Sequence, residues 1–181
     1  MKKIIAFFCL AVACHGVAHS QLYMTRTGFI GFYSKTSFED IDAENHQVYA
    51  VIDAGKKNIA FAVLLKGFVF TKELMQEHFN ENYVESDKYP KASFSGSYTG
   101  DAPPNKDGLN HVMVKGNLTL HNVTRAIEEP ATLEFKEGKL SGRADFTIRP
   151  EDFQISIPSI VRDKIASVIA VHVLIDCSTT K

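Results

Sequence analysis

The feature that most constrains this chain is a two-residue alternation of apolar and polar side chains, which dominates from residue 46 onward. Alternation with this period is typical of a β-strand that has one buried face. In residues 111–121, one face carries Val112, Val114, Leu118 and Leu120. The same alternation predicts further strands in residues 92–99, 131–135, 142–150 and 170–176.

Residues 58–70 form a longer run whose two faces are both apolar, apart from Lys66. The β-branched and aromatic side chains of this run favour a strand over a buried helix, and Gly67 is a position where the strand can bend. We expect one face of this strand to point inward. The alternative is that the opposite face points inward. The expected inward face carries Phe61, Val63, Leu65 and Val69, and the alternative face carries Ala62, Leu64, Phe68 and Phe70.

Turn-forming residues separate these segments. The N-terminal part is predicted to hold a hairpin around Thr27–Gly28, followed by another short strand. Residues 100–108 predict a loop, and Glu137–Gly138 predicts a tight hairpin. Short strands at this spacing indicate an all-β fold, and about eight strands close into an antiparallel barrel that is filled by side chains or holds one small ligand.

The period changes after Thr71, which we expect to be a helix N-cap. Apolar positions then recur at helical spacing, so the sequence predicts one short amphipathic helix near residues 72–84. His78 lies in this helix among several acids, but residue i+4 is Asn82, so the spacing of a zinc-protease helix is missing. We interpret His78 as a half-buried helix residue and the acids as a solvated face. The apolar stripe consists of Leu74, Met75, His78, Phe79 and Tyr83.

The first twenty residues have the pattern of a secretory signal peptide. Lys2 and Lys3 precede an apolar stretch over residues 4–12 that is too short to span a bilayer, and Ala18-His19-Ser20 fits a cleavage site. We expect cleavage before Gln21, a mature domain over residues 21–181, and a periplasmic or secreted location. Lipid attachment at Cys14 is the minor alternative.

Charge and cysteine content narrow the choice of partners. Loss of Lys2 and Lys3 leaves 18 basic residues against 21 acidic ones, a net charge of −3, and no basic tract. This balance argues against nucleic acid or an anionic membrane as the main partner. No later segment is long and apolar enough to span a membrane, and Cys177 is the one cysteine of the mature chain, so no internal disulfide is expected. A homodimer stays open.

The sequence contains no G-x-S-x-G, P-loop, G-x-G-x-x-G or C-x-x-C motif. We therefore expect neither an enzyme nor a bound cofactor or metal. One alternative stays open, a hydrolase or metal protein in which His111, His121 and His172 converge on one side of a barrel. The five mature histidines are His46, His78, His111, His121 and His172.

Three stretches resemble the YceI-like family of secreted lipid- or polyisoprenoid-binding proteins. Residues 70–96, "FTKELMQEHFNENYVESDKYPKASFSG", resemble its acidic, aromatic helix and the strand that follows. Residues 114–125, "VKGNLTLHNVTR", resemble its central hairpin, with Asn122 where glycine is usual. Residues 146–173 resemble its closing segment.

The resemblance implies a lipocalin-like barrel that encloses an elongated apolar tunnel and is closed at one end by the helix. It also implies a ligand such as an isoprenoid quinone, a fatty-acyl compound or a similar amphiphile, carried in the bacterial periplasm. Many members have a tryptophan and an aspartate–histidine–serine element on the first strands, and "LYMTRTGFIGFYS" has neither. The ligand's identity therefore does not carry over.

Of the thirteen phenylalanines, eleven follow residue 20, which exceeds what the seams of a thin-walled barrel need. We expect the surplus to line an apolar cavity that holds an isoprenoid or acyl chain, for transport, storage or stress response. The alternative is a solid-cored barrel that acts as a protein-interaction or stress module. The predicted cavity wall consists of Phe61, Val63, Leu65, Phe79, Tyr83, Phe94, Leu118, Leu120, Leu133, Phe146 and Ile148.

Overall fold

The computed structural model describes residues 21–104 and 106–179, and nine strands lie in this part of the chain. Neighbouring strands pair antiparallel, and β1 pairs with both β9 and β2, which closes the sheet into an eight-stranded barrel. The short β4 adds to β2 outside this circuit. The predicted fold class is therefore confirmed. The strands are β1 (Leu22–Lys35), β2 (Asp40–Asp53), β3 (Asn58–Leu64), β4 (Val69–Phe70), β5 (Lys91–Thr99), β6 (Gly108–Leu120), β7 (Val123–Lys136), β8 (Lys139–Ile148) and β9 (Ile169–Thr179).

The predicted helix is present as α1 (Glu73–His78), which continues as one turn of π-helix, η2 (Phe79–Tyr83). Its N-cap is Lys72 and no side chain caps it, so the expectation of a Thr71 cap was wrong. Three short 3₁₀ segments complete the helical elements of the described residues: η1 (Leu65–Gly67), η3 (Pro150–Phe153) and η4 (Ser159–Val161). Among the described residues, no helix is both long and apolar enough to cross a membrane.

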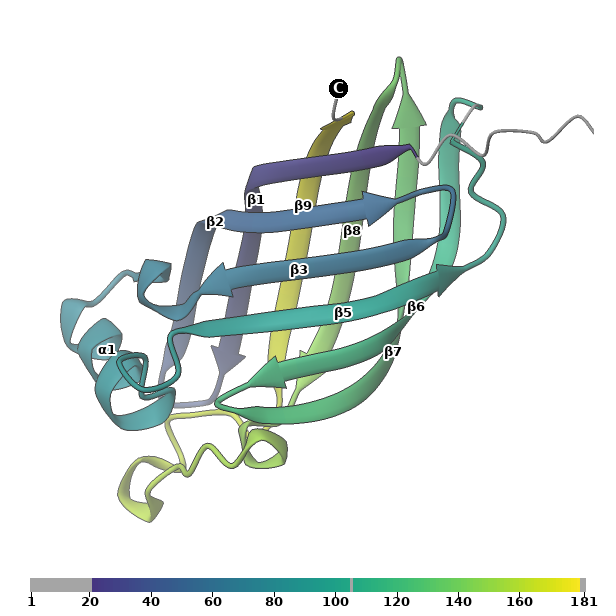
Figure 1. Ribbon diagram of the computed structural model, residues 1–181. Coiled ribbons are helices and arrows are strands. Elements are labelled where there is room, and N and C mark those ends of the chain that lie inside the picture. The colour runs from purple at the N-terminus through teal and green to yellow at the C-terminus, as the bar shows by residue number, and fades with distance from the viewer. Residues whose placement is uncertain (1–20, 105, 180–181) are drawn as a thin grey trace, which may run out of the picture.

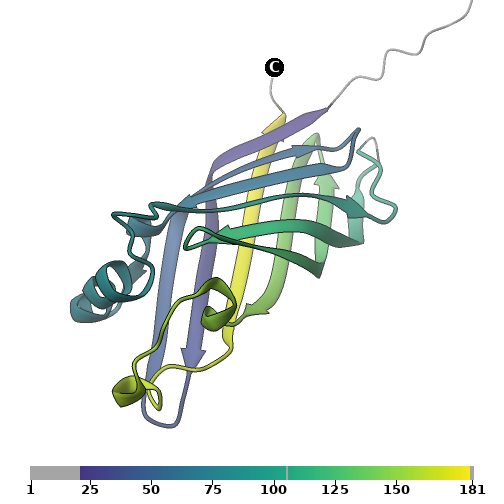
Figure 2. The same cartoon turned by 60° about the horizontal axis from the view of Figure 1, so that its bottom comes forward.

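The barrel is flattened into two layers. Figure 1 shows β3 and β5 running across β8 and β9, while β1 and β2 bend sharply and pass from one layer to the other. Figures 1 and 2 both place α1 and the segment between β8 and β9 at the same end of the barrel. The opposite end is packed solid by side chains such as Tyr23, Tyr98 and Leu140, each at most 2% exposed. The α1 end is therefore the end at which a ligand can enter the barrel.

The hairpin predicted around Thr27–Gly28 was wrong. β1 runs unbroken for 14 residues, with register shifts on both sides of Gly28, and the turn to β2 comes later, where the Thr36 N–H donates to the Glu39 carbonyl. A Cβ at Gly28 would lie 3.1 Å from a methyl of Ile175 and 3.2 Å from the Cβ of Val48. Glycine is needed here for close packing at a strand bend, not for a reverse turn.

The single strand predicted for residues 58–70 was also wrong, because η1 interrupts it. β3 ends at Leu64, and the 3₁₀ turn changes which face points inward. Phe61, Val63 and Leu65 point inward as expected, and after the turn Phe68 and Phe70 are buried as well. Leu64 and Val69 are left 57% and 65% exposed.

Two tight turns have the left-handed backbone that two-residue hairpins require. Glu137 and Gly138 have φ of 51° and 74° and join β7 to β8, as predicted. His121 and Asn122 have φ of 51° and 58° and join β6 to β7. Asparagine tolerates this left-handed conformation, so Asn122 fits this turn without a glycine.

The predicted signal peptide and the lipidation alternative at Cys14 lie outside the described residues. Cys177 is buried, at 2% exposure.

Candidate ligand-binding cavity

The α1 end of the barrel contains an apolar cavity of about 520 Å³. Its walls come from the inward faces of the strands, from α1 and η2, and from the segment that includes η3 and η4. Apolar and polar residues alternate along the strands because one face contacts this interior. The predicted helical stripe also lines the cavity, with Leu74, Met75 and His78 from α1 and Phe79 and Tyr83 from η2. The interpretation of His78 as half-buried was wrong, because its side chain is exposed. The sequence pattern and the cavity therefore have one physical cause, the burial of apolar surface.

A second cavity of about 130 Å³ lies deeper in the barrel. Its surface is almost wholly apolar, although Glu129 and Arg143 border it. The residues that line both cavities, and so lie between them, are Ile30, Val63, Ala92, Leu118 and Phe146.

The structure places all eleven residues of the predicted wall on one or both cavities. Their contact with a ligand stays a prediction. Leu65, Phe79, Tyr83, Leu120 and Ile148 line the outer cavity, Phe61, Phe94 and Leu133 line the inner one, and Val63, Leu118 and Phe146 line both.

Sequence reasoning missed an aromatic cluster beneath α1. The ring of Phe79 lies 5.5 Å from that of Phe32, 5.6 Å from that of Phe68 and 5.1 Å from that of Phe70, measured between ring centroids. Phe32 was missed because its strand was read as a hairpin, and Phe68 and Phe70 because η1 was not foreseen. Edge-to-face and tilted pairs at these distances add stabilisation beyond area burial, so this cluster fixes η2, and with it the preceding α1, on the barrel.

The segment after β8 was also missed as part of the wall. Ile155, Ile157, Val161 and Ile165 all line the outer cavity. Phe153, Ile155 and Ile157 alternate in the sequence, and that short alternation was the available signal.

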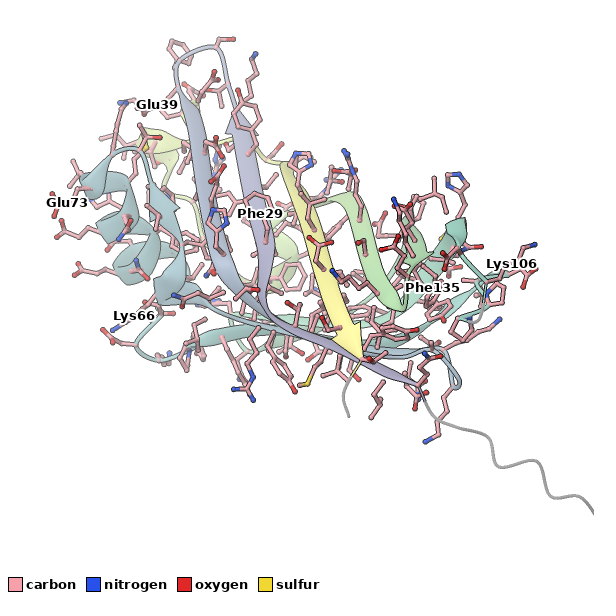
Figure 3. All side chains as sticks on the ribbon, turned by 90° about the horizontal axis from the view of Figure 1, so that it is seen from above. Phe29, Glu39, Lys66, Glu73, Lys106 and Phe135 are labelled. Atoms are coloured by element: carbon pink, nitrogen blue, oxygen red, sulfur yellow. The ribbon has the colours of Figure 1, made fainter. Side chains whose placement is uncertain are left out.

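The mouth of the outer cavity carries charge. Lys72 Nζ lies 2.6 Å from Glu39 Oε1, which joins the start of α1 to the turn between β1 and β2. Figure 3 shows Glu39 on this hairpin beside α1. The hydrogen bond from Lys72 lowers the pKa of the Glu39 carboxyl, and the charge of Lys164 lowers it further. Ser34, 1% exposed, also lines the cavity, and its Oγ accepts a hydrogen bond of 2.8 Å from the Ala166 N–H.

His121 joins three segments at this end of the barrel. Its Nδ1 lies 3.1 Å from the Phe153 carbonyl oxygen and its Nε2 lies 2.7 Å from Glu85 Oε2. The edge of the ring packs against Tyr89, with 4.6 Å between ring centroids. A carbonyl and a carboxylate can only accept, so the imidazolium, with a proton on each nitrogen, is the form that makes both bonds. The bond from His121 lowers the pKa of Glu85.

The alternative of converging histidines has no support in the described residues. There, no group of three histidine, cysteine or acidic side chains is placed to hold a metal. His172 lies on the exposed face of β9, where its Nδ1 is 2.5 Å from Asp145 Oδ1. Arg143 Nε is 2.7 Å from the other oxygen of Asp145, and these two neighbours lower the pKa of that carboxyl. This is a surface charge ladder.

Comparison with solved structures gives the same architecture. The chain superposes on a polyisoprenoid binding domain from Saccharophagus degradans with a TM-score of 0.75 and 13% identity, covering 88% of this chain and 98% of that chain. For BcnA from Burkholderia cenocepacia the TM-score is 0.69, with 13% identity and coverage of 84% and 96%. For the Campylobacter jejuni YceI protein it is 0.61, with 16% identity and coverage of 77% and 84%. At these identities the likeness establishes the fold alone.

No curated protein matches the sequence. The family model of the YceI-like domain matches residues 16–178, which is most of the chain. The chain therefore belongs to the YceI-like domain family.

Proposed function

We propose that this protein holds the chain of an isoprenoid or other long-chain amphiphile inside its barrel. The observation that carries the proposal is an apolar cavity of about 520 Å³ whose lining includes the neighbouring charged residues Glu39, Lys72 and Lys164. Ligand pockets commonly span about 300–1,000 Å³. The tail would extend past Leu118 into the inner cavity, whose 130 Å³ is close to the size of apolar cavities, on the order of 150 Å³, that stay dry and take up small apolar molecules.

The energetics favour binding of moderate strength. Each buried methylene contributes about 0.8 kcal/mol, while association costs roughly 4–15 kcal/mol. A long tail is therefore needed before binding is favourable. The walls are mostly apolar, so they select for the length and shape of the tail and leave selection by polar groups to the charged residues Glu39, Lys72 and Lys164.

The comparison with a polyisoprenoid binding domain from Saccharophagus degradans supports this class of ligand. Isoprenoid quinones fall within the class. The solid-cored alternative requires a filled barrel, and the two cavities are the observation against it.

The proposed role is binding for transport, storage or stress response, without catalysis. We further propose that residues 1–20 direct export and are removed before Gln21, so that the barrel works in the periplasm or outside the cell.

The test is to express the full chain in a bacterial host, purify it without detergent, extract it with organic solvent and identify the extract by mass spectrometry. We expect about one amphiphile per chain. If the extract is empty and the delipidated protein also fails to bind added prenols, quinones and fatty acids, the proposal is wrong. The mass of the purified protein reports the export step separately, because cleavage before Gln21 and lipidation at Cys14 give different N-termini.

A further inference from the structure

We propose that the ligand carries an anionic head group, a carboxylate or a phosphate, held at the mouth by Lys164 and Lys72 with the hydroxyl of Ser34. This inference rests on the proposed function and names the chemical class of the head group. The tail alone does not require it, because the walls would accept a neutral amphiphile equally well.

The charges at the mouth do not balance. The residues with ionisable acidic or basic side chains that line the outer cavity are Glu39, Lys72, His78 and Lys164. Glu39 pairs with Lys72 at 2.6 Å. Lys164 makes no ion pair within 4.0 Å among the residues that the structure describes. One positive charge at the mouth is therefore left without a direct counter-ion.

These charged side chains come from three separate segments. Glu39 lies in the turn between β1 and β2, Lys72 just before α1, and Lys164 just after η4. Three segments that are distant in the sequence thus bring their charges to one opening. Lys164 acts on the same Glu39 carboxyl that Lys72 binds, so both cations lie within electrostatic reach of one point.

A buried hydroxyl donor lines the same cavity as these charges. Ser34 lines the cavity at 1% exposure, and its oxygen already accepts the bond from the Ala166 N–H. No acceptor is found for its hydroxyl hydrogen among the described residues, so this hydrogen is free to donate to a head group. Hydroxyl and ammonium donors together suit an anion, because charge-assisted hydrogen bonds are stronger than neutral ones.

A neutral head group would form no ion pair with Lys164 and would add little to the binding free energy. An anion would be attracted to Lys164 and would share Lys72 with Glu39. Glu39 limits the preference, since it repels an anion whenever Lys72 turns away. We expect an anionic head group to improve affinity about tenfold over a neutral one on the same tail.

The experiment uses the delipidated mature protein and two matched pairs of probes. One pair is cis-parinaric acid and its methyl ester, and the other is farnesyl phosphate and farnesol. We expect the anionic member of at least one pair to bind about tenfold more tightly, and this advantage to shrink as salt screens the mouth. The pair with the larger advantage shows whether the natural head group is a carboxylate on an acyl chain or a phosphate on an isoprenoid.

The variants are Lys164→Gln and, as a matched control, Lys66→Gln. Lys66 pairs with Asp87 on the surface at 2.5 Å and lines neither cavity, so its loss changes net charge equally. The advantage of the anion should disappear in Lys164→Gln and persist in Lys66→Gln. Equal affinity for the charged and neutral members of both pairs in the unmodified protein would overturn the head-group inference and leave the lipid cavity intact. Failure of all four probes to bind would count against the proposed function itself.

Discussion

Gly67 lies so close to Asn45 that a Cβ atom at residue 67 would be 2.7 Å from the Asn45 Nδ2 atom. The Asn45 side chain is 1% exposed. Its Nδ2 donates to the Leu64 carbonyl at 2.9 Å, and its Oδ1 accepts from the Gln47 N–H at 2.8 Å. One buried amide therefore fixes the end of β3, the 3₁₀ turn that follows it, and the bend of β2. The turn brings Phe68 and Phe70 to the cavity.

The first prediction concerns this contact. Gly67→Ala should lower the free energy of unfolding by about 1–3 kcal/mol, because the new methyl group displaces a buried amide from its hydrogen bonds. Urea unfolding measures this loss. In an Asn45→Ala background the same substitution should cost much less, because the atom that clashes is gone. An equal cost in both backgrounds would show that Asn45 is not the reason for glycine at this position.

The strands β5 to β9 could be predicted from the sequence because each has one buried face. The polar neighbours on either side of Leu118 or Phe146 indicate that these apolar side chains lie on the buried face of their strands. For the strand residues of the predicted wall, alternation alone therefore indicated which side chains face the interior.

The break after Leu64 could not be predicted in the same way. Both faces of residues 58–70 are apolar, so the pattern carries no information on where the inward face changes. The cause is a contact between Asn45 and Leu64, 19 residues apart in sequence. Gly28 was misread for a related reason, because a glycine that permits close packing looks the same in sequence as one that permits a turn. Neither the charged mouth nor the bond from His121 to Glu85 has a local signal, since each joins separate segments.

The second prediction tests the passage between the two cavities. Leu118 lines both, so Leu118→Trp should fill the space between them and weaken binding of cis-parinaric acid by at least about tenfold. The control is Met113→Trp, on the same strand but 38% exposed and lining neither cavity. Fluorescence titration measures both. Unchanged affinity in a folded Leu118→Trp variant would mean that the tail does not pass this residue.

The third prediction concerns the attachment of α1. Phe79→Ala removes a ring that contacts Phe32, Phe68 and Phe70, and we expect a loss of about 2 kcal/mol because the site is only half-buried. Hydrogen exchange should rise most in residues 73–83, and bound lipid should dissociate faster. Glu77→Ala, on the exposed face of the same helix, should change neither exchange nor dissociation. Faster exchange spread evenly over the barrel would argue against a local role for Phe79.

The fourth prediction is that Cys177 is unreactive in the folded protein. The thiol is 2% exposed, and burial raises its pKa to about 12, with a smaller contribution from Asp176. The thiolate is the reactive form, so a thiol-specific reagent should modify almost no protein at neutral pH and about one thiol per mature chain after unfolding in urea. Rapid modification of the native protein would show that the end of β9 opens readily.

The last prediction concerns the pH dependence of stability at the bond between Glu85 and His121. The folded pKa of Glu85 lies below its ordinary value of 4.5, mainly because His121 donates to it. A carboxyl with a lowered folded pKa contributes stability that is fully present above its unfolded pKa and is lost as pH falls through the folded pKa. Glu85→Gln should therefore be less stable than the unmodified protein near neutral pH, and the difference should vanish in acid.

Urea unfolding across this pH range measures the effect, and Glu81→Gln is the matched control, since it removes a carboxylate from the same helical region without touching His121. The control should show a smaller difference with no such dependence on Glu85. A difference that stays constant from acid to alkaline pH would mean that the charges of this pair do not contribute to holding η2 against the β6–β7 turn.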